Sequence, residues 1–208
     1  SGENVVESTQ AMPWYTGPTI LECLESIPPM IDIHSALPLL EIQGIYEGAA
    51  YGKVLQGTLD VKSALYRETQ SLEIEECYVN GIPSAVAAPG DQVTLLGSDI
   101  QILARGQQWG IESPLQGTEC TVELCWMGDA MEPGTIEFIL RRGAAERIAR
   151  VDLPTRINPN DIQQITLNLS APIDVLTERI QAKKERIILI DKTTNATVAA
   201  GIIKQINQ

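Results

Sequence analysis

Basic side chains and histidine are scarce in this chain of 208 residues. Fifteen Lys and Arg residues stand against 27 Asp and Glu residues, which gives a formal net charge of −12. A nucleic-acid-binding surface needs a basic face to neutralise phosphates, so this balance argues against nucleic acid as a partner. The single histidine, His34, lies in a linker-like stretch, and we therefore expect neither a catalytic triad nor a histidine-based metal site.

Long apolar runs, a secretion signal and paired cysteines are also missing. No run of about 18 apolar residues exists, and the first residues, SGENVVE, are neither basic nor continuously apolar. The four cysteines form no C-x-x-C pair, and Cys120 and Cys125 would face opposite sides of an extended strand. We expect a cytoplasmic protein with no membrane segment, with reduced structural cysteines and without a metal site.

Nucleotide-binding motifs are absent as well. The sequence contains no G-x-x-x-x-G-K-[ST] loop to hold phosphates and no N-K-x-D motif for a guanine base. The glycine-dense segment 42–59 has no Lys-Ser or Lys-Thr at the required spacing, and its composition favours tight hairpins. We therefore predict no catalytic, cofactor-binding or metal-binding residue in this chain.

Two charged clusters could imitate a binding or catalytic site, and we interpret both as solvated surface. The acidic segment 71–79, SLEIEECYV, places Glu73 and Glu75 on one outward strand face, with a change of phase near Glu76 that indicates a bulge. The best local basic patch lies on a predicted strand–turn–strand and consists of Arg141, Arg142, Arg147 and Arg150.

The segment 10–27, QAMPWYTGPTILECLESI, predicts a linker followed by one short helix. Pro18 suits the first turn of a helix, and an apolar stripe continues from there until Pro28-Pro29 ends it. We assign residues 1–29 to this linker and helix. The stripe consists of Ile20, Leu21, Leu24 and Ile27.

After residue 29 the sequence changes to short extended segments with turns every 8–12 residues, which is typical of small β-barrels. Residues 30–108 are predicted to form the first barrel, and Pro89-Gly90-Asp91 marks one of its turns. Residues 109–208 are predicted to form the second. There, the segment ECTVELCWM has the alternation of a strand, which places Val122, Leu124 and Trp126 on one face. The predicted fold is all-β, with two consecutive barrels.

Several short strings, in order, resemble one family. The chain is similar to the large, GTP-binding subunit of bacterial sulfate adenylyltransferase, a member of the elongation-factor-like GTPases. The matching strings cover nearly the whole chain. They are MPWY-x-GPT at 12–19, G-K-V-x-x-G at 52–57, PGDxV at 89–93, DI with RG at 99–106, WM at 126–127, and ILID with TVAAG at 188–201.

The resemblance implies that these are the second and third domains of such a subunit and that a GTPase domain, with its GTP and Mg²⁺, precedes them. On this view the chain is not an enzyme by itself. Its barrels would position the GTPase domain and dock the small catalytic subunit of a GTP-dependent sulfate adenylyltransferase. Interfaces favour Trp and Tyr, so possible contacts with these partners are Trp14, Tyr15, Trp109 and Trp126, although core burial is favoured for Trp126.

Two alternatives remain open from the sequence. The barrels could belong to a translation elongation, release or ribosome-rescue GTPase that binds tRNA or a protein partner. Residues 1–110 carry 14 acidic and 4 basic side chains, which disfavours tRNA but leaves a protein-binding rescue factor open. The chain could also be a stand-alone relative that lost its GTPase domain and kept a scaffold role.

Overall fold

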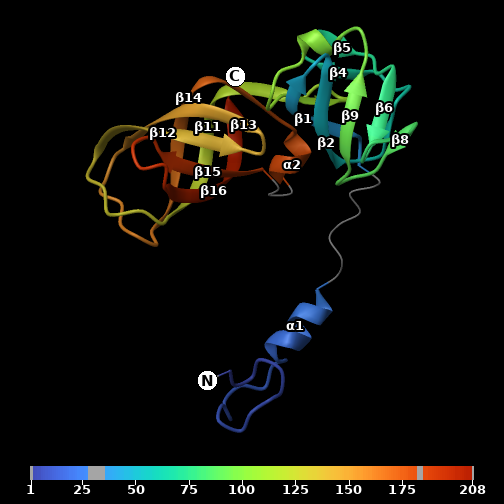
Figure 1. The fold of residues 1–208 in the computed structure, drawn as a ribbon. Coiled ribbons are helices and arrows are strands. Elements are labelled where there is room, and N and C mark those ends of the chain that lie inside the picture. The colour runs from blue at the N-terminus through green and yellow to red at the C-terminus, as the bar shows by residue number, and fades with distance from the viewer. Residues whose placement is uncertain (1, 28–35, 182–184, 208) are drawn as a thin grey trace. The chain divides into compact units, whose positions relative to one another are not determined.

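The computed structural model describes residues 2–27, 36–181 and 185–207 (Figure 1). The chain divides into two compact units, Ser1–Ile33 and His34–Gln208. The predictions for Pro28, Pro29 and His34 concern residues outside the described ranges. Among the described residues, no helix has the length and apolar character needed to cross a membrane.

The first unit contains the helix α1 (Ile20–Ser26). Thr19 is its N-cap: the Thr19 hydroxyl accepts the Glu22 N–H at 3.2 Å, and the Glu22 carboxylate accepts the Thr19 N–H at 2.7 Å. This reciprocal capping box satisfies two N–H groups at the helix start. The predicted helix is confirmed, with one correction: Pro18 precedes the cap and lies outside the first turn. No residue of α1 is buried.

The first β-module, residues 36–110, is an antiparallel sheet that curls around an apolar core (Figure 1). Its eight strands follow the order β5-β4-β10-β1-β2-β9-β6-β7, and a separate ribbon pairs β3 with β8. Hydrogen bonds leave β5 and β7 as edges, so this predicted barrel is a curled sheet and not a hydrogen-bonded ring. The strands are β1 (Leu39–Tyr46), β2 (Ala49–Gln56), β3 (Leu59–Asp60), β4 (Leu65–Arg67), β5 (Gln70–Leu72), β6 (Glu76–Val79), β7 (Ile82–Pro83), β8 (Val86–Ala87), β9 (Gln92–Leu96) and β10 (Gln108–Gly110), with a 3₁₀ turn η1 (Ile100–Ile102) before β10.

The hairpin turns explain why the glycine-dense segment folds as strands. Glu47-Gly48 joins β1 to β2 with φ of 49° and 77°, and Asn80-Gly81 joins β6 to β7 with φ of 51° and 81°. Positive φ at both central residues is the type I′ conformation, whose twist matches that of the flanking strands. The expected hairpin is therefore present between β1 and β2.

Strand β10 belongs to the first sheet. It pairs with β1, where Trp109 lies opposite Leu40, and with β4 through Gly110. Trp109 is fully buried in the first core. The predicted boundary between residues 108 and 109 thus falls inside this strand, because the last strand of the module returns to pair with its first.

The second β-module is a closed antiparallel ring of six strands in the order β11-β14-β13-β12-β15-β16 (Figure 1). The hairpin expected around residues 141–150 is present, since β12 pairs with β13 from Arg142–Ala145 outward. The short helix α2 was not predicted. The elements are β11 (Leu115–Trp126), β12 (Gly134–Arg142), β13 (Ala145–Leu153), β14 (Ile162–Val175), α2 (Thr177–Gln181), β15 (Arg186–Asp191) and β16 (Thr197–Asn207).

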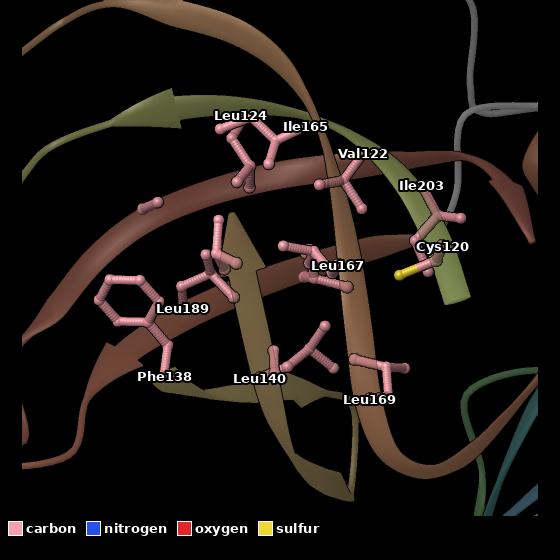
Figure 2. Close-up of a cluster of buried hydrophobic side chains, with 14 of the residues drawn as sticks. Cys120, Val122, Leu124, Phe138, Leu140, Ile165, Leu167, Leu169, Leu189 and Ile203 are labelled. Atoms are coloured by element: carbon pink, nitrogen blue, oxygen red, sulfur yellow. The ribbon is translucent and has the colours of Figure 1, made fainter. Parts of the chain in front are cut away.

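The alternation predicted for β11 places its apolar side chains inside the ring. Val122 and Leu124 are fully buried and Trp126 is 2% exposed. Figure 2 shows Val122 and Leu124 pointing into a cluster with side chains from the other strands. The rings of Trp126 and Phe138 meet edge-on, with centroids 5.8 Å apart, a favourable aromatic arrangement.

Candidate functional site: a buried charged contact between the two modules

Buried polar side chains of the second unit gather where the two β-modules meet. Each is at most 4% exposed. Removing a charge from water is costly unless it is paired and hydrogen-bonded, so each buried charge here requires a partner. The residues are Glu41, Gln56 and Gln108 of the first module and Arg142, Asp174 and Glu185 of the second.

Asp174, in β14, joins the second module to two strands of the first. Its two carboxylate oxygens accept the Nε–H of Arg67 in β4, each at 3.1 Å. One of them also accepts the backbone N–H of Gln108 in β10 at 2.9 Å. A buried carboxylate with three donor contacts is well satisfied, and it fixes the ends of β4 and β10 against the barrel.

Glu185 forms a second group of ion pairs, within the second module, beside the same contact. It accepts a hydrogen bond from Nη1 of Arg142 at 3.0 Å and another from Nε of Arg179. Arg179 reaches on to the side-chain oxygen of Gln56 in β2 at 3.4 Å. The chain Arg142–Glu185–Arg179–Gln56 therefore runs from the second module into the first.

The turn of the β12–β13 hairpin packs directly on β1 of the first module. Gly143 has φ of 54°, and a Cβ added there would overlap the Glu41 carboxylate. A Cβ added at Gly106 would lie 2.5 Å from the Cα of Ala145. Arg105 donates from Nε to the carbonyl of Ala144 at 3.2 Å. Only glycine fits at both positions, so the two modules approach each other backbone to backbone.

Glu41 carries the main electrostatic cost of this contact. Burial raises the pKa of its carboxyl above the ordinary value of 4.5, and the nearby Arg142 charge opposes that rise. A backbone hydrogen bond from Ala144 also opposes the rise, and the Glu185 charge adds to it. Arg142, Ala144 and Glu185 all belong to the second module, so the ionisation of Glu41 depends on that module remaining in place.

This site can hold two modules together but offers no chemistry of its own. Its members are carboxylates, guanidinium groups and amides, most of which bond one another. The side-chain amide of Gln108 and the Nε and Nη2 groups of Arg142 are buried without a hydrogen-bond partner among the described residues. Within the described ranges, no three His, Cys, Asp or Glu side chains gather in a way that could hold a metal ion. The arrangement is that of a structural joint.

The four aromatic residues predicted as partner contacts occupy different environments. Trp109 and Trp126 are buried in the cores of their own modules. Trp14 is 77% exposed and Tyr15 is 40% exposed; their rings meet edge-on, and the Tyr15 hydroxyl donates to the Pro18 carbonyl at 2.8 Å. A partner could reach the latter two, and their role in binding stays a prediction.

The arginine cluster does not form a common basic patch. Arg142 is buried in the pair with Glu185, whereas Arg141 pairs with Glu146 on the surface at 2.5 Å. Arg147 donates to the carbonyl of Pro172 at 3.0 Å. Alternation along a strand sends neighbouring arginines to opposite faces, which separates Arg141 from Arg142.

The sequence analysis missed the charged contact, although one signal was present. Glu41 interrupts the apolar run Leu39, Leu40 and Ile42, and all four residues are buried. A lone acid in such a run indicates a buried partner of opposite charge. The Arg142 charge, which lowers the pKa of Glu41, comes from a residue 101 positions later that the sequence analysis groups with the surface arginines.

Comparison with known proteins first defines the class. No protein-family model matches the chain. The crystal structure of sup35 complexed with GDP matches 99% of this chain and 57% of that chain, with a TM-score of 0.73 and 19% sequence identity. At this identity the match shows the fold alone, which is the two-module β fold of translation-factor-type GTPases.

Sequence relatives identify the family that the chain resembles. The chain is 30% identical, over 98% of its length, to "Sulfate adenylyltransferase subunit 1" of Laribacter hongkongensis (strain HLHK9), and it covers 47% of that protein. It is 29% identical to "Bifunctional enzyme CysN/CysC" of Rhodopirellula baltica and 28% identical to "Bifunctional enzyme NodQ" of Rhizobium sp. (strain N33), covering 35% of each. The chain spans about half the length of the first relative and about a third of the other two. The chain is thus similar, along nearly its whole length, to part of sulfate adenylyltransferase subunit 1, which bears out the resemblance drawn from the sequence.

Proposed function

We propose that the two β-modules are the non-catalytic platform of a sulfate adenylyltransferase GTPase subunit. They position a GTP-binding domain and dock a separate small subunit that transfers the adenylyl group to sulfate. In this proposal the whole protein is a cytoplasmic, GTP-dependent nucleotidyltransferase subunit, and these modules themselves take neither GTP nor Mg²⁺.

The observation that carries the proposal is the buried charged contact. Asp174 joins the modules through Arg67 and Gln108, and Arg179, held by Glu185, reaches Gln56. The hairpin at Gly143 fits directly against Glu41. A platform must transmit a change at one face to another without bending, and packed interfaces of this kind do so because they resist continuous deformation. Similarity to sulfate adenylyltransferase subunit 1 supports the choice of sulfate activation over translation.

The test is binding between purified proteins. The chain is mixed with the small catalytic subunit of a sulfate adenylyltransferase, and complex formation is followed by sedimentation velocity. We expect a stable complex, weakened by Asp174→Ala, which breaks the joint, and unaffected by Arg156→Ala. Arg156 pairs with Glu132 on the surface of the second module, where both side chains are more than half exposed.

Parallel titrations with a GTP analogue and with tRNA separate the alternatives. We expect no binding of either molecule to this chain. Salt-sensitive tRNA binding, together with failure to bind the small subunit, would overturn the proposal in favour of a translation factor.

A further inference from the structure

The outer surface of the first module gathers three of the chain's five tyrosines on one face, which we call the tyrosine face: Tyr46, Tyr51 and Tyr78. Tyr46 in β1 lies opposite Ala49 in β2, and Ala49 is two residues before Tyr51, so both lie on the same face of β2. Tyr51 and Tyr78 both lie opposite Thr94 of β9, from the two neighbouring strands. Opposed residues of antiparallel strands share a face. The three rings therefore project from the same side of the sheet. The strands β1, β2, β9 and β6 that carry or separate them are neighbours in this sheet (Figure 1).

These side chains are accessible. Tyr46 is 64% exposed, Tyr51 is 42% exposed and Tyr78 is half-buried. The Tyr78 hydroxyl donates to Oε2 of Glu76 at 2.7 Å, which holds its ring along the strand. Tyrosine offers a large rigid surface at a small entropic cost, and an exposed group of such rings is typical of a protein-binding surface.

We propose that the tyrosine face binds a proline-containing segment of a protein partner in the polyproline II conformation. The proposal rests on the docking role above and names a surface for it. Tyr51 and Tyr78 stand two strands apart, which corresponds to about 9.6 Å at the usual strand spacing. A polyproline II helix repeats every three residues, or about 9.3 Å. Prolines three residues apart therefore meet the two rings when the segment crosses the strands.

Charge selects the residues that flank these prolines. The Glu76 carboxylate lies beside the Tyr78 ring, and Glu47, in the β1–β2 turn, follows Tyr46. Residues 36–110, which form the first module, hold nine acidic and four basic side chains, so approach of a cationic segment is favoured. A Lys or Arg next to the second proline would reach Glu76. The same charges oppose single-stranded nucleic acid, which also stacks on aromatic rings.

The test uses a fluorescein-labelled peptide with prolines three residues apart followed by arginine, titrated with the full chain and read by fluorescence anisotropy. We expect saturable binding that falls about tenfold or more in Tyr51→Thr and Tyr78→Thr, since each removes one ring. The matched control is Tyr66→Thr, because Tyr66 in β4 is also 42% exposed but lies outside the tyrosine face. A peptide with the same composition but without the three-residue spacing of its prolines should bind with an affinity at least about tenfold lower.

Three results would overturn the proposal: no saturable binding of the spaced peptide, equal binding of the respaced peptide, or an equal loss in Tyr66→Thr. Thermal melting of each variant checks that the sheet remains folded, so that loss of binding is attributable to the ring. A change in self-association caused by Tyr51→Thr, without peptide binding, would assign the face to a second copy instead. If the small subunit fails to bind while the peptide still binds, the proposed function is rejected and the tyrosine face is retained as a peptide-binding surface.

Discussion

The two β-modules bury comparable apolar cores but finish their sheets differently. In the second module every strand has two neighbours, because β16 pairs with both β11 and β15. In the first module β5 and β7 remain edges, and β7 is two residues long and contains a proline, which lacks a backbone donor. The closed ring satisfies its own backbone, whereas the open sheet takes part of its support from its neighbour, through Asp174 on β4 and β10.

The largest expected effect follows from removing that support. Asp174→Ala leaves the Arg67 charge and the Gln108 N–H without their partner at a buried site, which typically costs about 3–5 kcal/mol. We expect this loss in the free energy of unfolding of the first module, while the closed ring keeps its protection. Amide hydrogen exchange, resolved by module, measures both, with Arg156→Ala as the control. Equal loss of protection in the two modules would show that they unfold as one unit and would contradict the comparison.

A smaller effect concerns Glu41, where the open sheet meets the hairpin turn at Gly143. Its pKa is raised in the folded protein, so its favourable contribution to stability is present below about pH 4.5 and is lost as pH rises through the folded pKa. We expect Glu41→Gln to flatten this decline, so that the variant gains stability relative to the parent between about pH 5 and pH 8. Urea unfolding across this range measures the difference.

The control for that experiment is Glu146→Gln, in the same hairpin. Glu146 is a surface acid whose side chain is 45% exposed and pairs with Arg141. We expect its pH dependence to follow that of the parent. Parallel stability curves for the parent and Glu41→Gln would show that Glu41 does not limit the contact.

The smallest effect compares one thiol from each module. Burial raises the pKa of Cys120, in the closed ring, to about 12, and the Glu119 charge adds to this. Burial and then Asp91 also raise the pKa of Cys77, in the open sheet. We expect iodoacetamide at about pH 8 to label exposed Cys23 first, then Cys77, and Cys120 last, since thiolate formation requires the site to open.

Peptide mass spectrometry measures the order of labelling, and labelling in denaturant provides the reference in which these cysteines react alike. Labelling of Cys120 before Cys77 would mean that the closed ring opens more readily than the open sheet. That result would reverse the comparison between the modules.

Local sequence patterns predicted much of the fold, but they did not predict the contact between the modules. Alternation in β11 identified Val122, Leu124 and Trp126 as inward-facing because a strand has a strict period of two. The apolar stripe that predicted the short helix and the glycine signals that predicted hairpins are equally local. The pairing of β10 with β1 is a long-range feature, which no local pattern predicts. Trp109 was therefore assigned to the second module, although it lies in the sheet of the first.

The candidate site was the least predictable part. The pair of Arg67 with Asp174 joins residues 107 positions apart in the sequence. Arg142, which is buried in this contact, directly follows the surface residue Arg141, so residue type alone does not separate the two. The aromatic residues predicted to contact a partner were selected by residue type. Strand register, which is not available from the sequence, shows which aromatic rings point outward. Tyr51 and Tyr78 become neighbours only after β2, β9 and β6 are aligned.

The closed ring also sets an order for synthesis. The first sheet is complete once β10 (Gln108–Gly110) has been made, but the ring cannot close before β16 (Thr197–Asn207) joins β11. At typical elongation rates of about 5–20 residues per second, the ribosome needs about 5–20 seconds to cover that interval. The open sheet therefore has time to fold on the nascent chain while its neighbour still exposes unpaired strands. During synthesis a chaperone would therefore bind the second module, although that module satisfies its own backbone once it has folded.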